Sequence, residues 1–200
     1  MTRWYTEKKR EHFYKEAKRA GYRARSAYKL KQIQKKFHIL SRGDCVIDLG
    51  AAPGGWSQVA KELVGEFGVV IGVDIAPIKP LKDVQFIQGD MTEDQTKENI
   101  RKYLKDNAAD VILSDMSPNI TGNYSVDQAR SIWLCENALK TTETLLKSEG
   151  NFICKIFEGE DMEKFINVVK QRFRMIKKFS PVASRKSSSE VYLIAKSLKR

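Results

Sequence analysis

The chain has 200 residues, a length typical of one domain that buries a sizeable core. Its hydrophobic fraction of 42% is ordinary for a globular protein, and no apolar run approaches the ~18 residues of a membrane span. The N-terminus is charged and lacks the apolar segment of a secretory signal, so we expect a cytoplasmic protein without membrane contact. Its cysteines form no Cys-x-x-Cys motif, which argues against a zinc site and a disulfide framework.

The net charge of +11 is unevenly distributed along the chain. Residues 1–42 hold 14 basic and 3 acidic side chains, and residues 43–163 hold 11 basic and 21 acidic ones. Residues 164–200 hold 11 basic side chains, and Glu190 is their only acid. Two basic ends therefore flank an acidic middle. If both ends lie on one face, they form a surface suited to nucleic acid; the alternative is a solvated charged face.

The first 42 residues predict two helices. Residues 5–19 form a polar helix that ends before Gly21. A second helix begins at Arg23 and turns Ala27, Leu30 and Ile33 inward. The basic side chains of the first helix are Lys8, Lys9, Arg10, Lys15, Lys18 and Arg19.

This segment also carries groups that suit RNA. Tyr22 and Tyr28 could stack on unpaired bases, although Tyr28 fits the core better. Arg23 and Arg25 could hold phosphates. We expect residues 1–42 to form a basic helical segment that binds RNA and belongs to the same domain as residues 43–200.

From Asp44 onward, apolar runs typical of buried strands alternate with amphipathic helical segments. The expected helices cover residues 56–64, 94–105, 126–146 and 160–172. The expected strands cover residues 45–49, 69–74, 84–88, 110–115, 151–157 and 190–196, with an edge strand near 174–180. This alternation predicts an α/β, Rossmann-like fold whose mostly parallel, seven-stranded sheet carries helices on both faces. Ligands of such sheets bind at the carboxyl ends of the strands.

The stretch Asp48–Trp56 (DLGAAPGGW) joins the first strand to the next helix. Glycines in such a turn let the backbone approach a ligand closely. Gly50 and Gly54 do not fit the G-x-G-x-x-G spacing of a dinucleotide site, and Pro53 lacks an N–H donor. A ligand without phosphates suits this loop better. S-adenosyl-L-methionine (SAM), a nucleoside with an amino acid tail and a sulfonium, is such a ligand.

Acidic residues follow three successive strands. Asp74 ends the second strand, 24 residues after Gly50, close to the ~20 typical of an acid that takes ribose hydroxyls. Asp90 and Met91 end the third, where an adenine could rest, and Asp115 ends the fourth. Each acid alone could be a helix N-cap, but together they favour a shared ligand.

Lysine 155 interrupts the apolar run FICKIF of the fifth strand, where a charged side chain must be paired or must lose its charge. Glu190 similarly opens the apolar last strand. Both positions are therefore candidates for chemistry.

Four separated segments resemble the FtsJ-type ribosomal RNA 2'-O-ribose methyltransferases, also called RrmJ or RlmE. They are GAAPGGW (50–56), DMSPN (115–119), CKIF (154–157) and SEVY (189–192), in the order of that family, within residues 20–198. The resemblance implies a SAM-dependent methyltransferase fold. It places the catalytic set on Lys29, Asp115, Lys155 and Glu190. It places SAM binding on Gly54, Trp56, Asp74, Asp90 and Asp115, to which Gly50 and Met91 are added from their positions at strand ends. No metal is implied.

The implied reaction is in-line methyl transfer to a ribose 2'-oxygen, in which orienting the reactants is a large part of catalysis. Neutral Lys155 would accept the hydroxyl proton, and Lys29 nearby would favour that neutral form. Asp115 would position Lys155 and the methyl donor, and Glu190 would hold Lys29.

By analogy the target is a uridine of large-subunit (23S-type) ribosomal RNA within the large subunit, methylated by a monomer. We expect no appended RNA-binding domain, so the basic ends would bind RNA unaided. The alternatives are methylation of transfer RNA or of a messenger cap, a non-catalytic ribosome-assembly factor, and a nicotinamide oxidoreductase.

Overall fold

A computed structural model describes residues 13–104, 108–184 and 189–199. The expected first helix is therefore seen only as helical residues 13–19, and Lys8, Lys9 and Arg10 lie outside the described residues. None of the helices in these described ranges is both long and apolar enough to cross a membrane.

A seven-stranded sheet organises the described chain in the order β3-β2-β1-β4-β5-β7-β6. Its strands are β1 (Cys45–Leu49), β2 (Val69–Asp74), β3 (Gln85–Gln88), β4 (Ala109–Ser114), β5 (Leu146–Phe157), β6 (Phe173–Phe179) and β7 (Glu190–Leu198). Strands β1 to β5 pair in parallel, and β7 runs antiparallel to both β5 and β6. The strand order reverses between β1 and β4, the place where open α/β sheets bind ligands.

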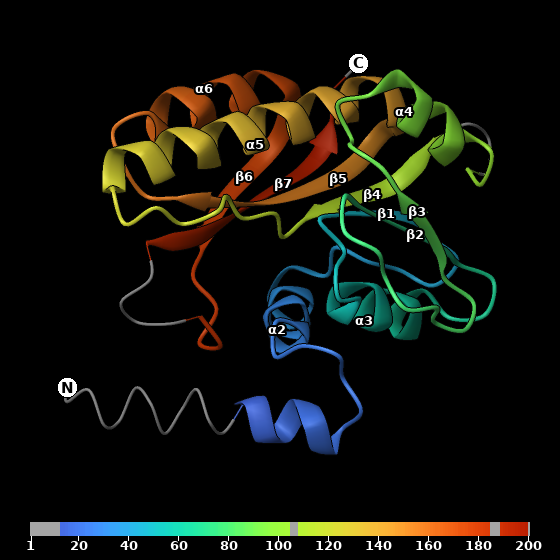
Figure 1. The fold of residues 1–200 in the computed structure, drawn as a ribbon. Coiled ribbons are helices and arrows are strands. Elements are labelled where there is room, and N and C mark those ends of the chain that lie inside the picture. Colours follow the sequence, from blue (N-terminus) through green and yellow to red (C-terminus); the bar gives the residue numbers. More distant parts are fainter. Residues whose placement is uncertain (1–12, 105–107, 185–188, 200) are drawn as a thin grey trace.

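Helices cover both faces of this sheet (Figure 1). On one face lie α5 (Tyr124–Leu145) and α6 (Met162–Arg172), with α4 (Asp94–Arg101) beside them. On the other lie α2 (Ala27–Phe37) and α3 (Gly55–Val64). Each layer buries its own hydrophobic core, one centred on α5 and α6 and one on α2 and α3.

Strand periodicity decides which face each catalytic candidate occupies. Successive side chains of a strand point to opposite faces. In β5, Cys154 and Ile156 pack in the α5–α6 core, whereas Ile153 packs in the α2–α3 core. Lys155 therefore points to the α2 side, together with its cross-strand partner Tyr192 of β7.

From Asp44 onward every expected helix and strand is present, with ends that differ from the expected ones by up to five residues. The second helix begins at Ala27 rather than Arg23, because the preceding residues are tied to α3: the Arg23 N–H donates to Gln58 Oε1 (2.8 Å). The helix α5 begins at Tyr124, two residues early, where the Asn123 side chain accepts from the Val126 N–H (3.4 Å). Strand β5 begins at Leu146 and contains an irregularity opposite residues 109–111 of β4.

Candidate active site

A pocket of about 410 Å³ lies at the carboxyl ends of β1 to β4. This volume suits a small organic ligand. Five of the residues expected at a SAM site line it: Gly50, Asp74, Asp90, Met91 and Asp115. Ala52, Met116 and Ser117, which belong to the GAAPGGW and DMSPN segments, also line it. The pattern did not single out its remaining walls, which are Val73, Ile75, Gly89, Thr92, Trp133 and Leu134.

Two of the pocket acids are held in place by nearby donors. Asp74 accepts one hydrogen bond from the Ala52 N–H (2.9 Å) and another from the Ala76 N–H (2.8 Å), which ties the glycine loop to the end of β2. Asp90 accepts from the N–H and the hydroxyl of Thr92, each at 2.8 Å. Both carboxylates are therefore fixed acceptors at the pocket wall, suited to hydroxyl and amino groups.

The glycine loop leaves no room for side chains on its inner side. Gly50 has a φ of 73°, and a Cβ there would meet the Met116 side chain at 2.5 Å. Gly54 has a φ of 109°, and a Cβ there would meet the Arg23 guanidinium at 2.9 Å. Glycine at these two positions therefore permits both the turn and the close packing around it.

Gly54 and Trp56, two other expected SAM residues, do not line the pocket. Trp56 is only 2% exposed, and its Nε1 donates to the Ser26 carbonyl (2.9 Å). Its ring stacks on Tyr192 with centroids 5.5 Å apart. What this segment can offer a ligand is the backbone at the N-terminus of α3, where first-turn N–H groups lack helical acceptors.

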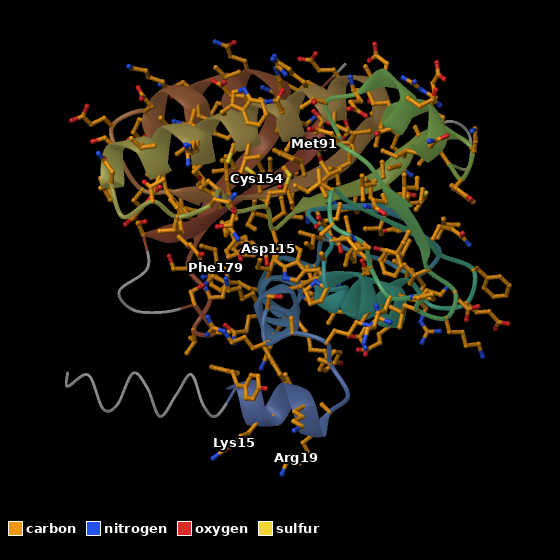
Figure 2. The ribbon with its side chains drawn as sticks, viewed as in Figure 1. Lys15, Arg19, Met91, Asp115, Cys154 and Phe179 are labelled. Carbon is orange, nitrogen blue, oxygen red and sulfur yellow. The ribbon has the colours of Figure 1, made fainter. Side chains whose placement is uncertain are left out.

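The four catalytic candidates come together on the α2 side of the sheet. The Nζ of Lys155 lies 3.1 Å from Asp115 Oδ1 and donates to the Asp115 carbonyl (2.7 Å). The Nζ of Lys29 lies 3.0 Å from Glu190 Oε2. Both lysines are buried, with side chains 6% and 7% exposed, so each charge depends on its carboxylate partner. Figure 2 places Asp115 near the middle of the molecule, between the sheet and α2.

Tyr192 joins these two pairs, a role that the sequence pattern did not indicate. Its hydroxyl donates to Asp115 Oδ1 (2.6 Å) and accepts from Lys29 Nζ (3.1 Å). The ring is fully buried, and burial followed by the nearby charge of Asp115 raises the pKa of Tyr192 well above its ordinary value. It is therefore a neutral hydroxyl that completes a chain from Lys155 to Glu190.

A further buried acid lies beneath the glycine loop. Asp48 is 0% exposed and accepts from the Ser57 hydroxyl (2.6 Å), while its second oxygen, Oδ1, has no hydrogen-bond partner among the described residues. Burial, opposed by Ser57, raises the pKa of Asp48 to about 7. This position was not expected to titrate, because the apolar run around it gave only a strand signal.

Arg23 is engaged with backbone rather than left open to solvent. Its guanidinium donates to the carbonyls of Lys79 (2.5 Å), Pro80 (2.6 Å) and Pro53 (3.3 Å). These carbonyls belong to the glycine loop and to the segment after β2, which both border the pocket. Positioning of these loops, rather than the phosphate contact considered for Arg23, is the role that the contacts favour.

Aromatic residues before α2 and in its first turn pack on one another. Tyr22 contacts Tyr28 edge-on (centroids 5.8 Å apart), and Tyr28 contacts Phe13 (5.6 Å). The Tyr22 hydroxyl donates to Glu62 Oε2 of α3 (2.7 Å). The cluster thus connects helical residues 13–19 to α2 and α3.

Comparisons with known proteins find a matching family and named relatives. The model of the family described as FtsJ-like methyltransferase matches residues 22–198. A Halorubrum lacusprofundi protein named ribosomal RNA large subunit methyltransferase E is 51% identical over 191 residues, or 94% of this chain and 71% of the relative. A protein of the same name from Methanocaldococcus jannaschii is 44% identical over 198 residues, or 97% and 81%.

Solved structures show the same architecture. A Plasmodium falciparum protein described as a ribosomal RNA methyltransferase aligns with a TM-score of 0.81 and 29% identity, covering 88% of this chain and 98% of that one. Fibrillarin from Aeropyrum pernix, solved with natively bound SAM, aligns with a TM-score of 0.57 and 14% identity over 78% and 68% of the two chains. At this level of identity, the similarity to fibrillarin shows a shared fold alone.

Proposed function

The chain belongs to the FtsJ-like methyltransferase family, and from this premise we propose that it methylates a ribose 2'-hydroxyl of large-subunit ribosomal RNA. SAM is the methyl donor. The target is a uridine within the large subunit, and the enzyme acts as a cytoplasmic monomer. Residues 1–42 contribute the basic RNA-binding segment of a single catalytic domain.

The pocket residues fit SAM. Carboxylates of Asp74 and Asp90 suit the ribose hydroxyls and the adenine amino group, and the apolar Ile75 and Met91 suit the faces of the base. The loop spacing and Pro53 disfavour a pyrophosphate, which SAM lacks. When bound, SAM supplies an electrophilic methyl group on a sulfonium.

One observation carries the catalytic assignment: Asp115 lines the pocket and is also bonded to Lys155. A ribose 2'-hydroxyl held by Lys155 would therefore lie next to the ligand site. We assign Lys155 to accept the 2'-hydroxyl proton, which requires its neutral form, and Asp115 to orient Lys155. Lys29, held by Glu190 and Tyr192, supplies a fixed positive charge beside the reacting oxygen.

The test is to map 2'-O-methyl groups on total RNA from cells with and without this protein. The proposal expects one large-subunit position to lose its methyl group, and expects purified protein with labelled SAM to restore it. Loss of a methyl group from transfer RNA or from a messenger cap alone would overturn the substrate assignment. Unchanged methylation everywhere would favour a non-catalytic assembly factor.

A further inference from the structure

The loop between β4 and α5 and the first residue of α5 expose apolar side chains, although the loop is firmly held. Ile120 is 64% exposed, and Tyr124 is 58% exposed. Yet the carboxylate of Asp127 accepts from the N–H and hydroxyl of Thr121 (2.8 Å each) and from the Gly122 N–H (3.2 Å). A loop fixed in this way keeps its apolar groups in water, which costs free energy unless something covers them. We call Ile120 and Tyr124 the 120–124 shelf.

The shelf lies on the same edge of the sheet as the catalytic candidates. It follows Asp115 directly in sequence, and the Tyr124 hydroxyl donates to the carbonyl of Glu158, just beyond β5. The Glu158 N–H in turn donates to the Ser189 carbonyl (2.8 Å), and Phe157 pairs with Glu190 across the strands. Figure 1 shows the start of α5 and the end of β5 at the same end of the molecule.

The charges around the shelf select the part of an RNA that it suits. The acidic side chains nearby are Asp127, Glu158, Glu160 and Asp161, and the basic ones are Arg130, which donates to the Asn119 carbonyl (3.4 Å), and Lys164, which pairs with Asp161. Acidic groups outnumber basic ones here, so this surface has no excess of positive charge to hold a sugar-phosphate backbone. Bases carry no net charge and stack on exposed aromatic rings, which is the common way for proteins to hold unpaired nucleotides.

We propose that the 120–124 shelf seats an unpaired base flanking the target nucleotide, with the Tyr124 ring as its stacking surface. The inference rests on the proposed function and adds to it a base subsite outside the reacting ribose. Tyr124 then orients the strand that carries the target, and the hydroxyl bond to Glu158 fixes the ring for stacking. Such a contact acts on RNA affinity and leaves the chemical step and the cofactor pocket unchanged.

The experiment measures kcat and KM for large-subunit RNA from cells that lack the protein, using labelled SAM and the Tyr124→Ala and Tyr124→Phe variants. Tyr124→Ala should raise the KM for RNA by roughly tenfold, the size of one lost stacking contact, with little change in kcat. Tyr124→Phe keeps the ring and should stay within about threefold of the wild type. The control Tyr103→Ala removes an exposed tyrosine after α4 and should change neither constant.

The proposal has three contrary outcomes. A normal KM in Tyr124→Ala would overturn it, and so would equal losses in the Ala and Phe variants, since these would mean that only the bond to Glu158 matters. A dimer that Tyr124→Ala dissociates without any effect on KM would assign the shelf to a second copy. If the wild-type protein fails to methylate this RNA while binding SAM, the proposed function is what fails.

Discussion

The hydroxyl of Tyr192 donates a 2.6 Å hydrogen bond to Asp115 Oδ1, the oxygen that also lies 3.1 Å from Lys155 Nζ. One carboxylate oxygen therefore accepts a hydrogen bond from the tyrosine of β7 and pairs with the lysine of β5. Because Tyr192 also accepts from Lys29, the position of the Asp115 carboxylate depends on α2 as well as on the sheet. Tyr192 thus lies between the Lys29–Glu190 pair and the Lys155–Asp115 pair.

The Tyr192→Phe change should lower methyl transfer while leaving SAM affinity nearly intact. It removes both hydrogen bonds of the hydroxyl but keeps the ring that stacks on Trp56. Buried charged partners lose about 1–3 kcal/mol each when such a bond is removed, so turnover should fall by roughly tenfold or more. Single-turnover rates and SAM titration measure the two effects. Normal turnover would show that Asp115 and Lys29 need no bridge.

Substitutions of Asp74 and Lys155 should affect different steps: the first should weaken SAM binding, and the second should slow methyl transfer. Asp74 lies in the pocket and bonds the backbone of Ala52 and Ala76, so Asp74→Ala should weaken SAM binding by roughly tenfold or more. Lys155→Ala should keep most SAM affinity and lose about 10²–10⁴ in rate, as expected for a lost general base. Isothermal titration and methyl-transfer assays distinguish the two variants, with Asp94→Ala on α4 as a neutral control. Near-normal turnover of Lys155→Ala would contradict the mechanism.

The sequence pattern was sufficient for the fold and for much of the site, for a physical reason. Parallel strands bring their carboxyl ends to one edge, so Asp74, Asp90 and Asp115 had to lie together. Strand alternation likewise directs Lys155 to the α2 face. The bridging role of Tyr192 was not predictable, because a tyrosine in an apolar strand gives the same pattern as any core aromatic. Trp133, a pocket wall on α5, was missed because its placement depends on the packing angle of a helix.

The contacts of Arg23 favour a role in positioning loops over the phosphate contact considered from the sequence. Its planar guanidinium donates from two separate nitrogens to three carbonyls of two loops, a fork that the single ammonium nitrogen of a lysine does not reproduce. Arg23→Lys should therefore raise the Kd for SAM severalfold by loosening the loops that border the pocket. The control Arg42→Lys changes an exposed arginine and should have no effect. If Arg23→Lys weakens RNA binding at unchanged SAM affinity, Arg23 holds phosphate instead.

The buried Asp48 predicts a specific dependence of stability on pH. Burial raises its pKa in the folded protein to about 7, compared with about 3.9 when unfolded. Between these values the unfolded chain has released the proton that the folded chain retains, so this group destabilises the fold as pH rises from about 4 to 7. The full effect on the free energy of unfolding is on the order of 4 kcal/mol.

Replacing Asp48 with Asn removes the titration and keeps an acceptor for Ser57. Free energies of unfolding, measured by urea denaturation from pH 4 to 8, should show that the variant becomes progressively more stable than the wild type as the pH rises through this window. The gain should level off above the folded pKa of about 7. A constant difference between the two proteins across the series would mean that Asp48 does not titrate in this range.

RNA affinity should depend steeply on salt through the basic helical residues before α2. Lys15, Lys18 and Arg19 are exposed there, and Figure 2 shows Lys15 and Arg19 extending away from the sheet. Each phosphate contact contributes about 0.9 to the log–log slope of affinity against salt on a duplex, or about 0.7 on a single strand. Replacing all three with Ala should therefore reduce the slope by about 2 to 3. SAM binding should not change, because the cofactor pocket lies at the strand ends.

The matched control removes the same charge from the end of α4 and from α5 by changing Arg101, Lys102 and Lys140 to Ala. The helices α4 and α5 lie on the other face of the sheet from helical residues 13–19 (Figure 1). Filter binding across a salt series compares both triple variants with the wild type. If the two variants lose affinity equally, net charge alone attracts the RNA. If the control loses more, the RNA passes over the α4–α5 layer, and the basic N-terminal segment is a solvated face.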